Sequence, residues 1–107
     1  MRIEILWWQG CPSTEAALAD VRSALTELAI DDAEVRMREI KTDAEAVEAG
    51  FHGSPTILVD GQDLVAADDH EPVALTCRVY RRRDGRIAPI PDPEDVRDAL
   101  RRAAEVT

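Results

Sequence analysis

Cys11 is the residue of this chain whose position best suits chemistry. It follows a short apolar segment and opens a predicted helix, within the sequence Trp-Trp-Gln-Gly-Cys-Pro-Ser-Thr at residues 7–14. At the start of a helix, unpaired backbone N–H groups and the positive end of the helix dipole favour a thiolate over a thiol. The sequence therefore predicts a reactive cysteine at this point.

A second feature lies some 40 residues further along the chain, where Gly-Ser-Pro-Thr at residues 53–56 opens another apolar segment. A proline that precedes a strand, rather than following one, indicates a fixed X-Pro bend. We therefore expect Pro55 to shape a loop at the entrance of that strand.

The composition limits the class of protein. The chain of 107 residues, 45% of them hydrophobic, is expected to form one domain spanning residues 1–107. A net charge of −9 would repel nucleic-acid phosphates and anionic lipid, so we expect neither as a partner. The N-terminal segment lacks the apolar core of a signal peptide, and no window approaches roughly 18 apolar residues. These features predict a cytoplasmic protein with no membrane association.

The chain has two cysteines, Cys11 and Cys77. So few cysteines in a cytoplasmic chain argue against a structural disulfide framework and leave catalytic, redox or metal-binding roles open.

Residue patterns predict the elements that must position these groups. Alternation predicts a strand over 2–8, and apolar spacings of three and four predict a helix from Pro12 to about Ala29. A strand follows over 33–38, and then a short helix between a capping box at 42–45 and Gly50. A hairpin of strands 56–59 and 62–65 turns at Asp-Gly, and a last helix starts at 92–93. Between 66 and 91 we expect an acidic loop (66–72) and a second hairpin of segments 75–80 and 87–90.

This element order, with a cysteine opening the first helix and an X-Pro pair before the third strand, resembles the thioredoxin-like fold. The fold class expected is α/β, with a central mixed sheet of about four strands flanked by helices. Cys11-Pro12 is similar to the opening of the Cys-Pro-x-Cys sites of glutaredoxins and of the bacterial periplasmic oxidases. The segment 53–56 resembles the cis-proline loop, and Trp8 stands near the tryptophan that thioredoxins keep before their motif.

The resemblance implies several roles. Pro55 would be cis and would face Cys11, and the backbone of Ser54 would be free to pair with an extended substrate. Substrate contacts would come from Pro12, Ser54, Pro55 and Trp8.

The chain also departs from the family pattern, because Thr14 occupies the position of the second motif cysteine. The lysine and paired glycines with which glutaredoxins hold glutathione are missing as well, so glutathione is poorly supported as the substrate. We expect monothiol chemistry without a cofactor: Cys11 attacks a disulfide of a protein or of a low-molecular-weight thiol, and the Thr14 hydroxyl stabilises the thiolate. Cys77 could resolve the product only if its Cα lies within roughly 7 Å of that of Cys11. The alternative for Cys77 is a small buried hydrophobe.

Other interpretations stay open. The fold could serve as a redox-silent binding module, with a groove rimmed by Trp7, Trp8 and Phe51, although these aromatic residues could equally belong to the core. A soft-metal or organomercurial-related thiol protein is a further alternative, but the spacing of the cysteines is poor and we expect no metal site. His52 could raise the thiolate fraction at Cys11 or be a plain loop histidine, and His70 has no expected role.

Overall fold

The computed structural model describes residues 1–65 and 72–106 of the chain. In chain order the elements are β1 (Arg2–Trp7), α1 (Thr14–Glu27), β2 (Glu34–Glu39), α2 (Asp43–Ala49), β3 (Thr56–Val59), β4 (Gln62–Asp63), β5 (Tyr80–Arg81), β6 (Ile87–Ala88) and α3 (Pro93–Val106). No helix within the described ranges is both long and apolar enough to cross a membrane.

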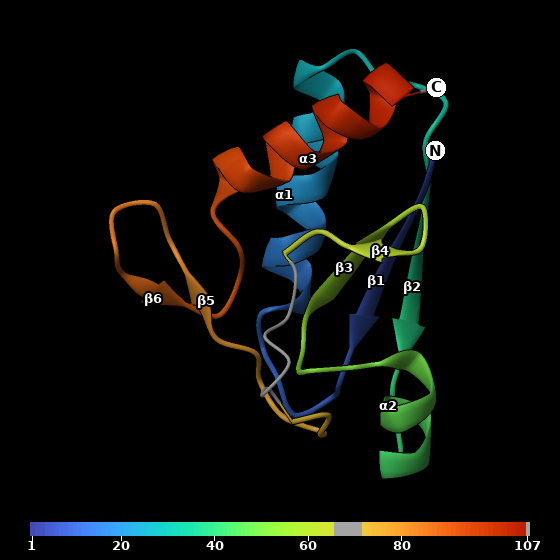
Figure 1. The fold of residues 1–107 in the computed structure, drawn as a ribbon, viewed down its shortest axis with the longest axis vertical. Coiled ribbons are helices and arrows are strands. Elements are labelled where there is room, and N and C mark those ends of the chain that lie inside the picture. Colours follow the sequence, from blue (N-terminus) through green and yellow to red (C-terminus); the bar gives the residue numbers. More distant parts are fainter. Residues whose placement is uncertain (66–71, 107) are drawn as a thin grey trace.

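Four strands form the main sheet in the order β2-β1-β3-β4 (Figure 1). β1 runs parallel to β2 and antiparallel to β3, so the sheet is mixed. The helical crossover through α1 allows the parallel pair, while the tight turn after β3 gives the antiparallel one. The predicted α/β architecture, with a four-stranded mixed sheet and helices, is therefore confirmed.

Apolar residues on the two faces of the sheet form two separate clusters. Helices α1 and α3 pack against each other and over one face of the sheet (Figure 1). The buried residues of this larger cluster come from β1, β3, α1 and α3: Ile3, Ile5, Ala17, Val21, Ala24, Leu25, Ile57, Val59, Val96 and Leu100. The smaller cluster, from β1 and the region of α2, contains Leu6, Ile40, Ala46 and Phe51. Because strand residues alternate between faces, β1 contributes to both clusters.

The capping and turn residues predicted the ends of several elements correctly. The Thr42 hydroxyl accepts a hydrogen bond from the Glu45 N–H (3.1 Å), and Gly50 is left-handed at the end of α2. Asp60 and Gly61 both have positive φ in the turn between β3 and β4, as a tight hairpin requires.

Several boundaries were wrong. α1 begins at Thr14 rather than at Pro12, so the segment from Cys11 to Ser13 is a turn that leads into the helix. β4 ends at Asp63 rather than at residue 65, because the Asp63 carboxylate accepts the backbone N–H of Val65 and turns the chain. The second hairpin exists, but its strands are only two residues each, in β5 and β6.

Residues 75–79 therefore do not form the predicted strand. They contribute one isolated parallel bridge instead, between Ser54 and Cys77. The predicted acidic loop, apart from Pro72, and His70 lie outside the described residues.

Candidate functional site

The Ser54–Pro55 peptide bond is cis, as the resemblance implied. The loop before it needs a glycine at position 53. Gly53 has φ +129°, and a Cβ there would lie 2.8 Å from the backbone of Arg78, closer than any real Cβ contact. The loop is thus packed directly against the 76–78 segment.

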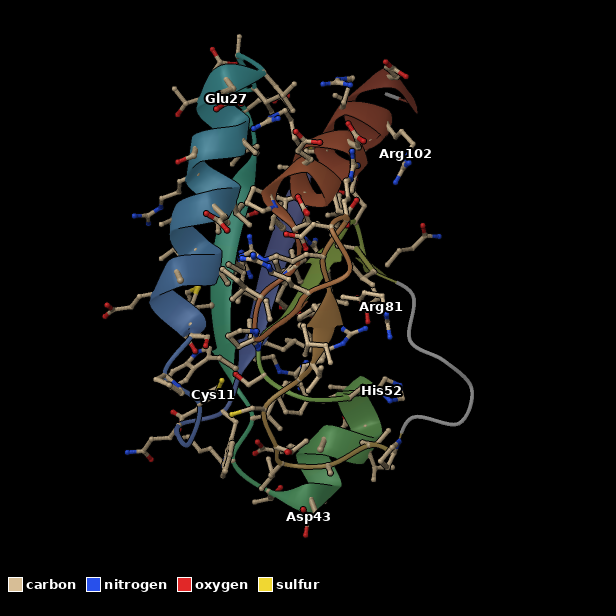
Figure 2. All side chains as sticks on the ribbon, turned by 90° about the vertical axis from the view of Figure 1, so that its left-hand side faces the viewer. Cys11, Glu27, Asp43, His52, Arg81 and Arg102 are labelled. Atoms are coloured by element: carbon tan, nitrogen blue, oxygen red, sulfur yellow. The ribbon has the colours of Figure 1, made fainter. Side chains whose placement is uncertain are left out.

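Cys11 lies at the lower end of α1, opposite the end marked by Glu27 (Figure 2). Its side chain is only 5% exposed. In its protonated form the thiol donates a hydrogen bond to the carbonyl oxygen of Ser54 at 3.3 Å. The prediction that the proline loop faces Cys11 is therefore confirmed.

The Ser54 hydroxyl links the cysteine turn to the proline loop. Its oxygen accepts the backbone N–H of Trp8 at 3.0 Å, which leaves the hydroxyl proton free to point elsewhere. The same hydroxyl also lowers the pKa of Cys11 and so favours the ionised form of its sulfur. A single buried serine side chain thus holds the turn in place and helps to stabilise the thiolate.

The pKa of Cys11 is lowered by hydrogen bonds that outweigh the cost of burial. Burial alone would raise the pKa, because it disfavours the charged sulfur. The backbone N–H of Ser13, the Cys77 side chain and the hydroxyls of Ser54 and Ser13 all act in the opposite direction. The net result is a thiol that ionises below its ordinary pKa, which is the property that a nucleophilic cysteine requires.

Cys77 is exposed and lies beside Cys11, since it bridges the backbone of Ser54, whose carbonyl accepts the Cys11 thiol. Its pKa is raised, first by the hydrogen bond to Cys11, then by partial burial and by the charge of the Cys11 thiolate. The alternative of a buried hydrophobe was therefore wrong. The two thiols form a pair in which Cys11 ionises first and Cys77 keeps its proton.

The backbone of Ser54 is not free, which corrects the expectation from the resemblance. Its N–H donates to the Thr76 carbonyl (2.8 Å), and its carbonyl accepts the N–H of Arg78 (2.9 Å). The 76–78 segment therefore occupies the edge that an extended substrate was expected to use, with Cys77 at its centre.

Arg78 anchors this segment. Its guanidinium, only 4% exposed as a residue, pairs with Asp63 at 2.8 Å and donates to the carbonyl of Val65 at 2.7 Å. It also lies 4.7 Å from the centre of the Tyr80 ring, whose hydroxyl donates to the carbonyl of Pro55. Because a buried cation left without its partner is costly, these contacts fix the backbone directly after Cys77.

A pocket of about 400 Å³ adjoins Cys11 on another side. Its lining combines an indole, a thioether, a proline ring and one carboxylate, and consists of Trp7, Cys11, Pro12, Thr14, Glu15 and Met37. The Thr14 hydroxyl oxygen is buried and has no hydrogen-bond partner among the described residues. Thr14 is not among the groups that shift the pKa of Cys11, so its predicted bond to the thiolate does not form here. Ser13 takes that role.

The remaining predicted residues are distributed as follows. Trp8 packs against the smaller apolar cluster, and its indole covers Gly10 so closely that a Cβ there would lie 2.3 Å from the ring. Phe51 is fully buried, so it does not rim a groove. His52 is half-buried and is not among the groups that shift the pKa of Cys11.

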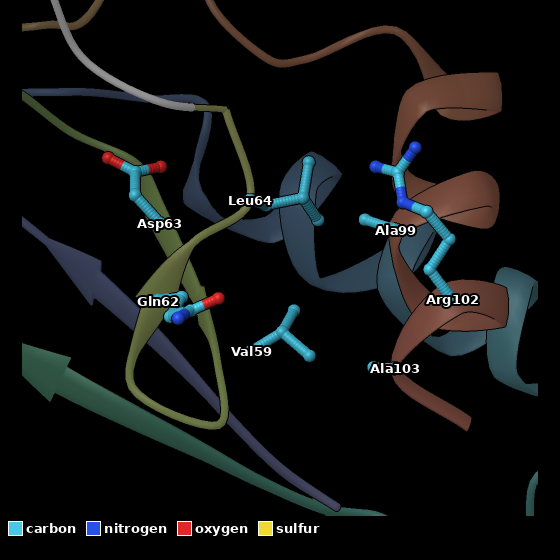
Figure 3. A pocket seen from close by; sticks show the side chains of 7 residues that line it. All are labelled: Val59, Gln62, Asp63, Leu64, Ala99, Arg102 and Ala103. Carbon is cyan, nitrogen blue, oxygen red and sulfur yellow. The ribbon is translucent and has the colours of Figure 1, made fainter. Parts of the chain in front are cut away.

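A smaller pocket of about 230 Å³ lies between the β3–β4 hairpin and α3, with Leu64 and Arg102 among its lining residues (Figure 3). It contains neither cysteine. Within residues 1–65 and 72–106, no group of three or more His, Cys, Asp or Glu side chains is placed to hold a metal ion.

Comparison of the chain with protein-family models, with curated proteins and with solved structures found no match. The function must therefore be argued from the site itself.

Sequence reasoning missed four residues of the site: Ser13, Glu15, Met37 and Arg78. Ser13 carried a usable signal, because the residue two positions after a cysteine in a helix-opening turn presents its N–H to the sulfur. Met37 and Arg78 carried none, since only the parallel pairing of β2 with β1 and the bridge to Ser54 bring them near Cys11.

Proposed function

We propose that this chain is a thiol–disulfide oxidoreductase of thioredoxin-like type, with Cys11 as the nucleophile of a motif that has one cysteine and Cys77 as the second thiol. The observation that carries the proposal is the pair itself: the buried Cys11 thiol donates to the Ser54 carbonyl, and the exposed Cys77 bridges the backbone of the same serine, with the pKa of Cys11 lowered and that of Cys77 raised. The mixed sheet, the helix that follows Cys11 and the cis-proline loop support the assignment to this fold. A cytoplasmic location, where thiols are kept reduced, would make the dithiol the resting form.

The reaction begins at Cys11. Its thiolate attacks one sulfur of a disulfide R–S–S–R, so that a bond from Cys11 to that sulfur forms, the S–S bond breaks, and RS⁻ leaves and takes a proton from water. The Ser13 N–H and the hydroxyls of Ser13 and Ser54 hold the thiolate before the attack.

Cys77 completes the exchange. It loses its proton to solvent and attacks the Cys11 sulfur of the mixed disulfide, which releases the second thiol and leaves a Cys11–Cys77 disulfide. Two electrons pass from the protein dithiol to the substrate, which is reduced to two RSH. A low-molecular-weight thiol of the cell would return the protein to its reduced form by two further exchanges.

Alkylation with iodoacetamide between pH 4 and 9 tests the proposal. We expect half-reaction of Cys11 clearly below the free-thiol value of roughly 8.5, with Cys77 reacting at higher pH. Cys11→Ser serves as the control that isolates Cys77. Half-reaction of Cys11 at or above the free-thiol value would remove the enzymatic interpretation and leave a redox-silent binding module.

A further inference from the structure

The Cys11 sulfur can be approached from two sides, and the chain itself occupies one of them. On the side of the proline loop, the N–H and carbonyl of Ser54 are both bonded to residues 76 and 78. An extended polypeptide that added itself to this edge would need the same two groups. It would have to displace the segment that Arg78 anchors.

The other side is the pocket lined by Trp7, Pro12 and Met37, which we call the Trp7–Met37 pocket. Its volume of about 400 Å³ suits a small molecule rather than a polypeptide chain. Thr14 also lines the pocket, but its hydroxyl oxygen is buried away from solvent and offers no contact to a ligand.

The charge of the pocket limits the ligand further. Glu15 is its one charged lining residue, and the whole chain carries a net charge of −9. A ligand with carboxylates would meet repulsion from both, whereas a neutral or cationic one would not.

We propose that the substrate of Cys11 is a low-molecular-weight disulfide with a neutral or cationic body, which enters through the Trp7–Met37 pocket, while residues 76–78 exclude extended polypeptides from the Ser54 edge. The inference rests on the proposed function and specifies its substrate class. The disulfide is reduced by the two exchanges described above, so one RS⁻ leaves through the pocket and the second thiol follows when Cys77 attacks.

Two probes with the same leaving group separate small from extended substrates. One is the 2-pyridyl disulfide of 2-mercaptoethanol, and the other is an unstructured peptide whose central cysteine carries the same pyridyl group. Release of pyridine-2-thione is followed for each, and each rate is divided by that of N-acetylcysteine with the same probe. We expect the normalised rate for the peptide to be lower by about tenfold or more, equivalent to about 1.4 kcal/mol.

A charge placed in the pocket tests where the body of the substrate lies. Met37 is 40% exposed, so Met37→Glu adds a carboxylate to the lining without opening the core. Cystamine is the cationic probe and dithiodiglycolate the anionic one, and the readout is the ratio of their rates. At low ionic strength we expect the ratio to rise about fivefold, and to fall back in high salt. Val47→Glu, at a 69% exposed position of α2 outside the pocket, is the matched control and should leave the ratio unchanged.

The outcomes separate the two proposals. Equal normalised rates for the peptide and the small probe, or an unchanged ratio in Met37→Glu, would overturn the substrate class while Cys11 still acted on disulfides. If Cys11 reacted with no disulfide faster than N-acetylcysteine does, the proposed function would fail, and the substrate class with it.

Discussion

Replacing Cys77 by alanine removes one of the hydrogen bonds that stabilise the Cys11 thiolate. Cys77→Ser is the matched variant, because a hydroxyl can still donate to the sulfur but cannot form a disulfide. We therefore expect the pKa of Cys11 to rise in Cys77→Ala and to stay close to that of the native protein in Cys77→Ser.

The size of the effect follows from the energy of one such bond. A hydrogen bond to a charged group contributes about 1.5–3 kcal/mol, and the low end applies because Cys77 is exposed and a thiol is a weak donor. That energy corresponds to about a tenfold lower thiolate fraction at pH values below the pKa. A more basic thiolate is also more nucleophilic, which with a Brønsted coefficient near 0.45 recovers about threefold. The net expectation is a rate about three- to fourfold lower below the pKa and about threefold higher above it.

The assay is the rate of iodoacetamide alkylation of Cys11, measured by peptide mass spectrometry across the pH range in all three proteins. The curves of Cys77→Ala and the native protein should cross, which a general loss of structure would not produce. Superimposable curves for Cys77→Ala and Cys77→Ser would show that the second thiol does not stabilise the first, and would refute the reasoning.

Three further experiments test the anchoring of residues 76–78, the charge of the Trp7–Met37 pocket and the lowered pKa of Cys11. Asp63→Ala leaves the Arg78 guanidinium buried without its carboxylate partner and should lower the free energy of unfolding by about 3 kcal/mol. Glu34→Ala, which breaks an exposed ion pair, should lower it by less than about 1 kcal/mol. Urea titration measures both losses, and equal losses would contradict the anchoring role of Arg78. Glu15→Gln should lower the cystamine-to-dithiodiglycolate rate ratio about threefold, while Glu27→Gln, at the other end of α1, should leave this ratio unchanged. An equal decrease of the ratio in both variants would argue against a local effect of the Glu15 charge. In the Cys77→Ser background, the Cys11 thiol with its lowered pKa stabilises the fold above the unfolded-state pKa, and this contribution is lost as the pH falls through the folded-state pKa. The melting-temperature advantage of Cys11 over Cys11→Ser should therefore grow as the pH rises toward the free-thiol pKa of roughly 8.5, and a constant difference would contradict it.

The parts of the fold that the sequence predicted well are those fixed by local chemistry. The Thr42 cap, the left-handed Gly50 and the Asp60-Gly61 turn each depend on residues within four positions of one another. The alternation of β1 and the continuous apolar run of β3 also follow directly from the residues, because a strand needs apolar side chains on each face that is buried.

The site was harder to predict because its key contacts join distant parts of the chain. The position of Cys11 was predictable from the helix that follows it, and Cys77 was named as a possible second thiol. Its closeness to Cys11 was not predictable, because it depends on the bridge between Cys77 and Ser54. That single bridge both brings the second thiol to the first and closes the edge that the resemblance left open. Thr14 was the natural candidate for the thiolate because of its place in the motif, yet the turn directs Ser13 to the sulfur instead.

Reaction of the reduced protein with a small excess of 2-hydroxyethyl disulfide, followed by intact-mass and peptide mass spectrometry, tests the central claim most directly. We predict a product lighter than the starting protein by two hydrogen atoms, with no free thiol and with Cys11 joined to Cys77, while Cys77→Ser should stop at a mercaptoethanol adduct on Cys11. A stable adduct on Cys11 of the native protein with Cys77 still free, or a protein that keeps both thiols, would contradict the account.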